Sequence, residues 1–188
     1  MSSLLIRNAT LPDGRSGLDV LCVDGRIANL APRIPASAER TIDAGGMLVA
    51  PPFVDAHFHM DSTLTYGMPR VNASGTLLEG IALWGELKPT LTLEAIVGRA
   101  LAYCDWAVGK GLLAIRSHVD TSDPRLLAVE ALLHVRERVK PYLDLQLVAF
   151  PQDGLLRSPG ALHNLKRALS MGVDVVGGIP HFERTMTD

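Results

Sequence analysis

The composition of this 188-residue chain is that of an ordinary globular protein, with 47% hydrophobic residues, 20% charged residues and a net charge of −2. The basic residues are scattered and the net charge is small, which argues against a nucleic-acid or anionic membrane surface. Two isolated cysteines favour a reducing compartment over a disulfide framework. No secretory signal is apparent and no apolar run approaches the ~20 residues of a membrane span, so we expect a cytoplasmic protein.

Residues 1–50 contain short apolar runs separated by turns. Runs at 19–23 and 26–30 flank Asp24-Gly25, which is a strong signal for a β-hairpin. Further strands are expected at 4–9, from Thr41 and from Met47. This pattern predicts a small antiparallel β domain of the sandwich type over residues 1–50.

From residue 51 onward, apolar strands alternate with helical stretches. Thr92 is expected to cap the second helix, and Ser122 or Asp123, followed by Pro124, the third. Repeating βα units with nearly continuous apolar strands predict a parallel sheet covered by helices over residues 51–188. The expected strands are 48–59, 112–120, 143–152 and 173–182, and the expected helices lie near 76–87, 93–110, 124–139 and 160–171.

Each of these strands ends in side chains that can bind or react. In barrels and in doubly wound sheets, the site lies at the carboxyl ends of the parallel strands. We therefore expect these side chains to gather at one edge of the sheet. They are His57 and His59, His118 and Asp120, Gln152 and Asp153, and His181 and Glu183.

The His57-Phe58-His59 segment is the most specific motif. Because side chains alternate along a strand, both histidines point to the same face, and two imidazoles can share one metal ion at Zn–N distances of ~2.0–2.1 Å. A catalytic zinc-type site generally has three protein ligands, so this pair is at most part of one. The alternative is a hydrogen-bonded histidine pair lining a pocket. The other face is apolar and is expected to pack against helices: Val54, Ala56, Phe58 and Met60.

The other strand ends allow several roles. His118 is a candidate ligand, a substrate contact or a residue that orients a ligand, and equally a buried histidine bonded to Asp120. Gln152 offers a donor and an acceptor side by side, which suits an amide or amidine edge, and Phe150 can wall a flat ring. A glutamine that caps a loop is the alternative for Gln152. Leu77 is a candidate substrate contact, with simple packing as its default role.

The remaining histidines are less informative. His181, like His118 and Asp120, is a candidate for orienting a ligand without binding the metal itself. Glu183 is expected to hold a loop of the site. His134 and His163 fall in expected helices, where solvated or structural roles are expected. No dinucleotide or phosphate-binding loop, nucleophile elbow or His-Glu-x-x-His motif is present, nor the Pro-Cys-x-x-Cys signature of zinc base deaminases.

The number of strands raises a question of completeness. A full (β/α)₈ barrel takes ~250 residues, whereas residues 51–188 hold four βα-type strands. The chain is either a complete small open α/β sheet or the first half of a barrel. The second interpretation is favoured, because a half-barrel alone would leave two apolar strand edges unpaired.

Five separated segments together resemble the amidohydrolase superfamily, and within it the bacterial cytosine deaminases. The resemblance covers nearly the whole chain. It implies a (β/α)₈ TIM barrel of the metal-dependent hydrolase type, of which about the first four βα units are present. The segments are 43–59, 74–77, 116–120, 148–154 and 178–183.

The resemblance also implies roles for individual residues. His57 and His59 would bind one divalent metal ion, Fe²⁺ or Zn²⁺, which activates water for attack on the ring carbon that carries the amino group. Gln152 would read the pyrimidine edge, while Phe150 and Leu77 shape the pocket. The family's other metal ligands and its acid/base glutamate belong to later strands, so no catalytic residue is assigned here, and we expect the native protein to be longer.

The leading hypothesis is thus a cytosine deaminase-like amidohydrolase whose partner is a small heterocyclic substrate. A related enzyme acting on an s-triazine, isocytosine or another cyclic amide or amidine is the nearest competitor. A different class of function is an inactive fragment that serves as a binding or assembly module. Homo-oligomer formation is left open, and no nucleic acid or membrane partner is expected.

Overall fold

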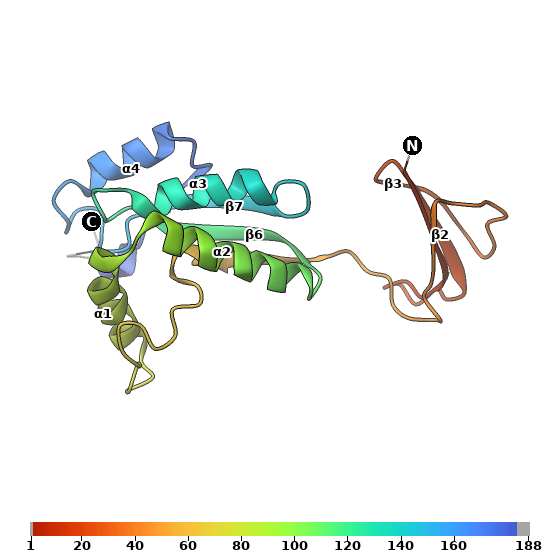
Figure 1. The fold of residues 1–188 in the computed structure, drawn as a ribbon, viewed down its shortest axis with the longest axis horizontal. Coiled ribbons are helices and arrows are strands. Elements are labelled where there is room, and N and C mark those ends of the chain that lie inside the picture. The colour runs from red at the N-terminus through yellow and green to blue at the C-terminus, as the bar shows by residue number, and fades with distance from the viewer. Residues whose placement is uncertain (1, 184–188) are drawn as a thin grey trace. The chain divides into compact units, whose positions relative to one another are not determined.

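The structure is a computed structural model that describes residues 2–183, apart from the side chain of His181. The chain divides into two compact units, Met1–Pro51 and Pro52–Asp188 (Figure 1). Each unit has its own four-stranded sheet. Among the described residues, no helix is both long enough and apolar enough to cross a membrane.

The first unit contains strands β1 (Ser3–Ala9), β2 (Leu18–Val23), β3 (Arg26–Ala31) and β4 (Arg40–Asp43), in the order β3-β2-β1-β4. The predicted hairpin between β2 and β3 is confirmed, because Asp24 and Gly25 have the positive φ angles that a two-residue hairpin turn requires.

Three details of the first unit differ from the prediction. β4 pairs with β1 in parallel, so the sheet is not purely antiparallel. The strand expected from Met47 reduces to a single bridge between Thr10 and Leu48. The described residues of this unit form one sheet, so the expected sandwich is not made by them alone.

The second unit carries the predicted parallel sheet. Its strands are β5 (Phe53–Phe58), β6 (Leu112–Asp120), β7 (Asp144–Phe150) and β8 (Val175–Val176), in the order β5-β6-β7-β8. The four expected helices are present as α1 (Leu77–Leu87), α2 (Leu93–Val108), α3 (Leu127–Val139) and α4 (Ala161–Ser170). Three 3₁₀ turns complete it: η1 (Met60–Ser62), η2 (Lys88–Thr90) and η3 (Pro180–Phe182).

The core of the second unit lies between the central strands and helices α2 and α3, which run along the sheet (Figure 1). Ile115 and Val119 on β6 pack with Leu147 on β7 and with Leu132 on α3, and all four are at least 98% buried. This packing fixes the positions at which β6 and β7 end. The end of β7 lines the site described below.

Strand β5 is shorter than predicted. Pro51 and Pro52 lack the N–H that a ladder needs, and the first hydrogen bond runs from the Phe53 N–H to the Gly111 carbonyl. The apolar face of β5 is buried only at its carboxyl end. Phe58 stacks on Tyr103 of α2 and Met60 is fully buried, whereas Val54 is 67% exposed and Ala56 is also exposed.

The last predicted strand, 173–182, is wrong beyond two residues. A Cβ on Gly177 would lie 2.8 Å from Val148 Cγ1 on β7, so the backbone passes very close to the neighbouring strand there. At Gly178, a Cβ would meet nothing within 4 Å. Pro180 cannot donate a ladder hydrogen bond, which disfavours a strand there, and it begins η3 instead.

The caps of the helices were predicted with mixed success. Thr92 caps α2 as expected, because its side chain accepts the N–H of Ala95. The expected cap of α3 at Ser122 or Asp123 is wrong. The Asp123 carboxylate instead accepts the backbone N–H and the guanidinium of Arg125. Helix α3 starts only after Leu126, which is left-handed (φ 54°) and buried in the core.

Candidate active site

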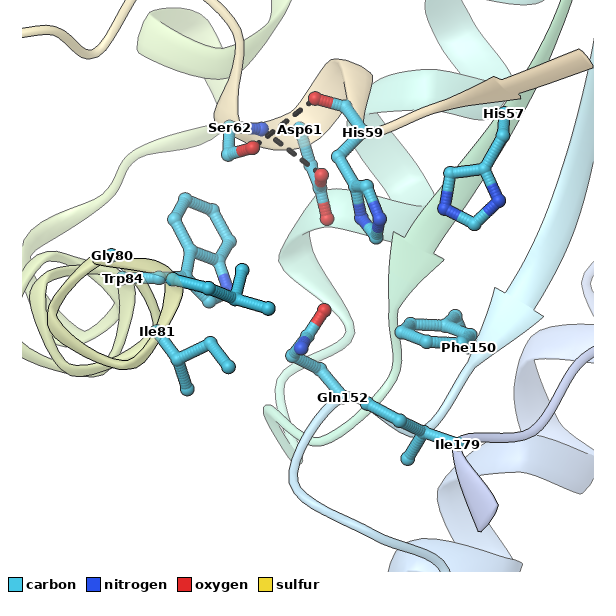
Figure 2. A pocket seen from close by; sticks show the side chains of 11 residues that line it. His57, His59, Asp61, Ser62, Gly80, Ile81, Trp84, Phe150, Gln152 and Ile179 are labelled. Atoms are coloured by element: carbon cyan, nitrogen blue, oxygen red, sulfur yellow. Dashed lines mark hydrogen bonds between the residues drawn. The ribbon is translucent and has the colours of Figure 1, made fainter. Parts of the chain in front are cut away.

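A cavity of about 360 Å³ opens at the carboxyl ends of the parallel strands, within the size range of small-molecule sites (Figure 2). One side, the strand wall, comes from β5, β7 and the segments that follow them. The opposite side, the helix wall, is one face of α1. The lining residues are His57, His59, Asp61, Ser62, Leu77, Gly80, Ile81, Trp84, Phe150, Gln152 and Ile179.

His57 and His59 both face this cavity, as the alternation along the strand predicts (Figure 2). Their ring centroids are 5.3 Å apart. Burial lowers the pKa of His59 to about 4, with smaller contributions from His118 and His57. A neutral imidazole keeps the lone pair that a metal ligand needs, so His59 is ready to coordinate at neutral pH.

The donor set fits a divalent ion such as Fe²⁺ or Zn²⁺, for which imidazole is a suitable ligand. The centroid separation of 5.3 Å allows both rings to reach one ion at Zn–N distances of ~2.0–2.1 Å. Within residues 2–183, no group of three or more His, Cys, Asp or Glu side chains is arranged to hold a metal. The two histidines could therefore supply only part of a set of metal ligands.

His118 lies behind the pair and does not line the cavity. Its ring stacks on His57 with centroids 4.0 Å apart and meets Phe150 edge-on at 5.3 Å. Burial, followed by the charge of His57, lowers the pKa of His118. The alternative in which His118 bonds to Asp120 is wrong: within the described residues Nδ1 of His118 is buried without a partner, and the Asp120 carboxylate bonds elsewhere.

Phe150 is the last residue of β7, Gln152 lies two residues later, and both line the cavity. The Gln152 side chain extends into the open space between Phe150 and the helix wall (Figure 2). Its backbone N–H donates to the Phe150 carbonyl. Glu183 accepts the N–H groups of Leu155 and Leu156, so it holds the loop after Gln152, as expected.

Leu77 reaches the cavity from the first turn of α1, where it is 75% exposed at the mouth. Thr76 caps this helix by accepting the N–H of Glu79. Gly80, Ile81 and Trp84 share its face, but the sequence reasoning missed them. Their spacing of three, four and seven residues from Leu77 was the available signal.

Asp61 is a further lining residue that was missed. It is 2% exposed, and its carboxylate accepts the backbone N–H groups of Asp120 and Ser62. Burial raises its pKa to about 7. It lies in η1, which follows the histidine strand directly, and this closeness to the His57-Phe58-His59 motif was the signal in the sequence.

Asp120 is 97% buried and contacts the helix wall rather than His118. Its carboxylate accepts the indole N–H of Trp84 at 2.8 Å and pairs with the Lys88 ammonium at 2.7 Å. The remaining predicted site residue, His181, has its side chain outside the described part of the structure. His134 and His163 are exposed on α3 and α4, away from the cavity.

The chain resembles several known proteins. The chain is 41% identical to 5-methylcytosine deaminase from Klebsiella pneumoniae, whose solved structure with phosphonocytosine superposes with a TM-score of 0.90 over 97% of this chain and 45% of that one. It is 36% identical over 181 residues to N-isopropylammelide isopropyl amidohydrolase from Pseudomonas sp. (strain ADP), covering 94% of this chain and 45% of the relative.

A solved structure of N-isopropylammelide isopropylaminohydrolase from Burkholderia multivorans is 32% identical, with a TM-score of 0.79 over 94% of this chain and 45% of that one. The chain thus spans about half the length of these relatives. Residues 40–187 match the Amidohydrolase family. The chain therefore belongs to the amidohydrolase family.

Proposed function

We propose that the chain supplies the metal-binding and substrate-reading part of an enzyme that hydrolytically deaminates a cytosine-like aminopyrimidine and releases ammonia. The observation that carries this proposal is the meeting of His57 and His59 with Phe150 and Gln152 around one cavity. The likeness to 5-methylcytosine deaminase supports a ring of this class.

The proposed roles follow from the chemistry of each side chain. His57 and His59 would hold one divalent ion, Fe²⁺ or Zn²⁺, which when bound supplies a water activated near neutral pH. The Gln152 amide offers N–H and C=O side by side to the N–C=O edge of the ring. The Phe150 ring packs against the face of a planar substrate, and Leu77 closes the mouth.

His118 would act through His57. A ring stacked at 4.0 Å limits the rotation of the His57 imidazole and so orients its lone pair. Asp120 would affect the cavity indirectly, because its carboxylate bonds Trp84 and Lys88 and so positions the helix wall.

We further propose that β5 to β8 are the first half of a (β/α)₈ barrel, with residues 1–50 and 51–188 as separate domains. The share of the relatives' length that the chain spans, 45%, supports this proposal. The general acid/base and the remaining metal ligands would then come from strands outside residues 1–188.

An s-triazine substrate is the second candidate. The relatives named N-isopropylammelide isopropyl amidohydrolase and isopropylaminohydrolase match the chain over nearly all of its length. A triazine carrying an alkylamino group is also planar and presents an amide edge, so Gln152 and Phe150 suit it equally well. The choice depends on the room beside the ring, where the helix wall lies.

The test is to supply the protein that carries this chain with Fe²⁺ or Zn²⁺ and measure amine release from a panel of aminopyrimidines and alkylaminotriazines. We expect ammonia from cytosine or a close analogue, and a loss of kcat/KM of about 100-fold or more in Gln152→Leu, because the ring would lose its hydrogen-bonding partner. Gln146→Leu is the matched control, since Gln146 is exposed on β7, the strand that precedes Gln152, and bonds Arg116.

The result that contradicts the proposal is a metal-loaded protein that releases neither ammonia nor alkylamine from any ring. Such a protein would fit the third alternative, a binding or assembly module. Alkylamine release from the triazines alone would select the second candidate.

A further inference from the structure

We propose that Lys88 is a positioning residue that holds helix α1 beside the cavity. The position of the Trp84 side chain would then depend on Lys88, and so would the size of the substrate ring that the cavity accepts. The substrate part of this inference rests on the function proposed above. The structural part concerns the described residues alone and can be tested separately.

Lys88 lies at the junction of α1 and η2, on the inner side of the helix wall. Its ammonium is 2.7 Å from Asp120 Oδ2 at the end of β6 and 2.9 Å from Asp153 Oδ2 after β7. The indole N–H of Trp84 donates to the same Asp120 oxygen at 2.8 Å. Two residues of one helix face, separated by one turn, are thus bonded to a single buried carboxylate.

The ion pair is well enclosed, with side-chain exposures of 12% for Lys88 and 4% for Asp120. In such surroundings, removal of one partner leaves an uncompensated charge, which is more costly than loss of a surface pair. Although burial favours the neutral amine, the Asp120 and Asp153 carboxylates raise the net pKa of Lys88. Lys88 therefore carries its charge throughout the physiological range.

The apolar packing of α1 is limited, which gives these polar contacts their importance. Only Leu83 and Leu87 of the helix are buried, and both lie in its second half. Leu77 and Leu78, in the first turn, are each more than 70% exposed. The part of α1 that faces the cavity is therefore located mainly by the bonds near its carboxyl end.

Asp120 is itself firmly held. Its Oδ1 accepts the Ser122 N–H at 2.7 Å, and its own backbone N–H donates to Asp61 Oδ2 at 2.8 Å. Since Asp61 follows the histidine strand directly, the chain of bonds runs from helix α1 to the segment beside His59. The distance between the indole and the metal-binding side is set through these contacts.

The structural test uses the fluorescence of Trp84. The chain has two tryptophans, so a Trp106→Phe background leaves Trp84 as the sole emitter. In that background, Lys88→Met should shift the Trp84 emission to longer wavelength and increase its quenching by acrylamide, because the indole becomes more exposed. Lys88→Arg, which keeps the charge, should restore much of the original emission.

Arg136→Met is the matched control. Arg136 pairs with Asp174 at 3.0 Å, with side-chain exposures of 24% and 38%, and neither residue lines the cavity. This variant should leave Trp84 emission unchanged. Should Lys88→Met fail to fold, Asp153→Asn removes one of the two carboxylates at a half-exposed residue and should give a smaller shift in the same direction.

The kinetic test uses the same Lys88 variants in the metal-loaded protein that carries this chain. Lys88→Met should raise KM for cytosine by about 10- to 100-fold with a smaller effect on kcat, because the wall is misplaced while the metal side is intact. The preference for cytosine over a ring with a bulky alkylamino group should fall. A merely structural role would reduce the active fraction and leave KM and this preference unchanged.

The two tests separate the two proposals. Unchanged Trp84 emission and quenching in folded Lys88→Met would overturn the role of Lys88, whether or not the protein is an enzyme. The expected change in emission, together with no turnover of any ring by the wild type, would support the structural role of Lys88 and reject the proposed function. Emission changes with unaltered KM and preference would overturn the link to ring size.

Discussion

The two walls of the cavity are held in place by different forces. The strand wall comes from β5 and β7, which are both paired with β6 in the sheet, and inner residues of β7 such as Leu147 and Ala149 are fully buried. The helix wall has few buried residues and depends on the Lys88 and Trp84 bonds to Asp120. The β7 side of the cavity is thus placed by packing in the core, whereas the opposite side is placed by a few polar contacts.

This difference assigns separate tasks to the two walls. Groups that hold a metal must be positioned within a fraction of an ångström, which is most readily achieved on packed strands. A wall that only limits substrate size tolerates change, so it can vary among relatives without loss of the chemistry.

The largest effect is expected from the core behind the strand wall. Leu147→Ala should lower the free energy of unfolding by about 2–5 kcal/mol, because it opens a cavity in a fully buried position. Urea denaturation measures this change. Leu78→Ala, at an exposed position of α1, is the control and should change the free energy of unfolding by less than about 0.5 kcal/mol. Equal losses in the two variants would contradict the contrast between the walls.

The next effect concerns the metal. His57→Ala should weaken Fe²⁺ or Zn²⁺ binding by at least about 100-fold, since loss of a direct ligand costs no less than loss of a group that supports one. Metal titration of the variant and of His134→Ala, an exposed histidine on α3, makes the comparison. Metal affinity that survives in His57→Ala would rule out this ligand assignment.

The smallest effect is expected at the amino end of the helix wall. Hydrogen bonds from the Ser74 hydroxyl and backbone, followed by Arg70, lower the pKa of Glu79 to about 2. Because the pKa of Glu79 is lowered from its ordinary value, its stabilising effect is present above about pH 4.5 and is lost as the pH falls through 2.

Glu79→Gln should therefore differ from the wild type above pH 4.5 and converge with it towards pH 2. Trp84 emission in the Trp106→Phe background reports the opening of α1. Glu86→Gln is the control, because it removes a second Arg70 partner without touching the first helical turn. A difference between wild type and Glu79→Gln that did not shrink on acidification would contradict the role of the charged carboxylate.

Patterns that depend on local geometry were predictable from the sequence. The shared side of His57 and His59 follows from strand alternation. The cap at Thr92 follows from short-range hydrogen bonding, and the hairpin turn at Asp24-Gly25 follows from φ preferences. The parallel order of the four strands follows from the repeated βα pattern. These features required no knowledge of distant contacts.

Features that depend on distant contacts were not predictable. Helix α3 begins later than predicted, because the Asp123 carboxylate bonds Arg125 and because Leu126 is buried in the core. Asp120 was paired with the wrong neighbour, since its true partners, Trp84 and Lys88, lie more than 30 residues earlier in the chain. The close approach of Gly177 to Val148, just after β8, appears only once both strands are placed.

The neighbouring glycines after β8 illustrate how unevenly the fold constrains its sequence. At Gly177 a methyl group would lie 2.8 Å from Val148 Cγ1 and 3.0 Å from the Ala149 carbonyl oxygen on β7, so neighbouring atoms would have to shift to admit alanine. At Gly178 the same methyl group would meet nothing within 4 Å. Two identical residues, adjacent in the chain, therefore differ in the room that the fold leaves for a side chain: the neighbouring strand crowds the first, and the second faces open space.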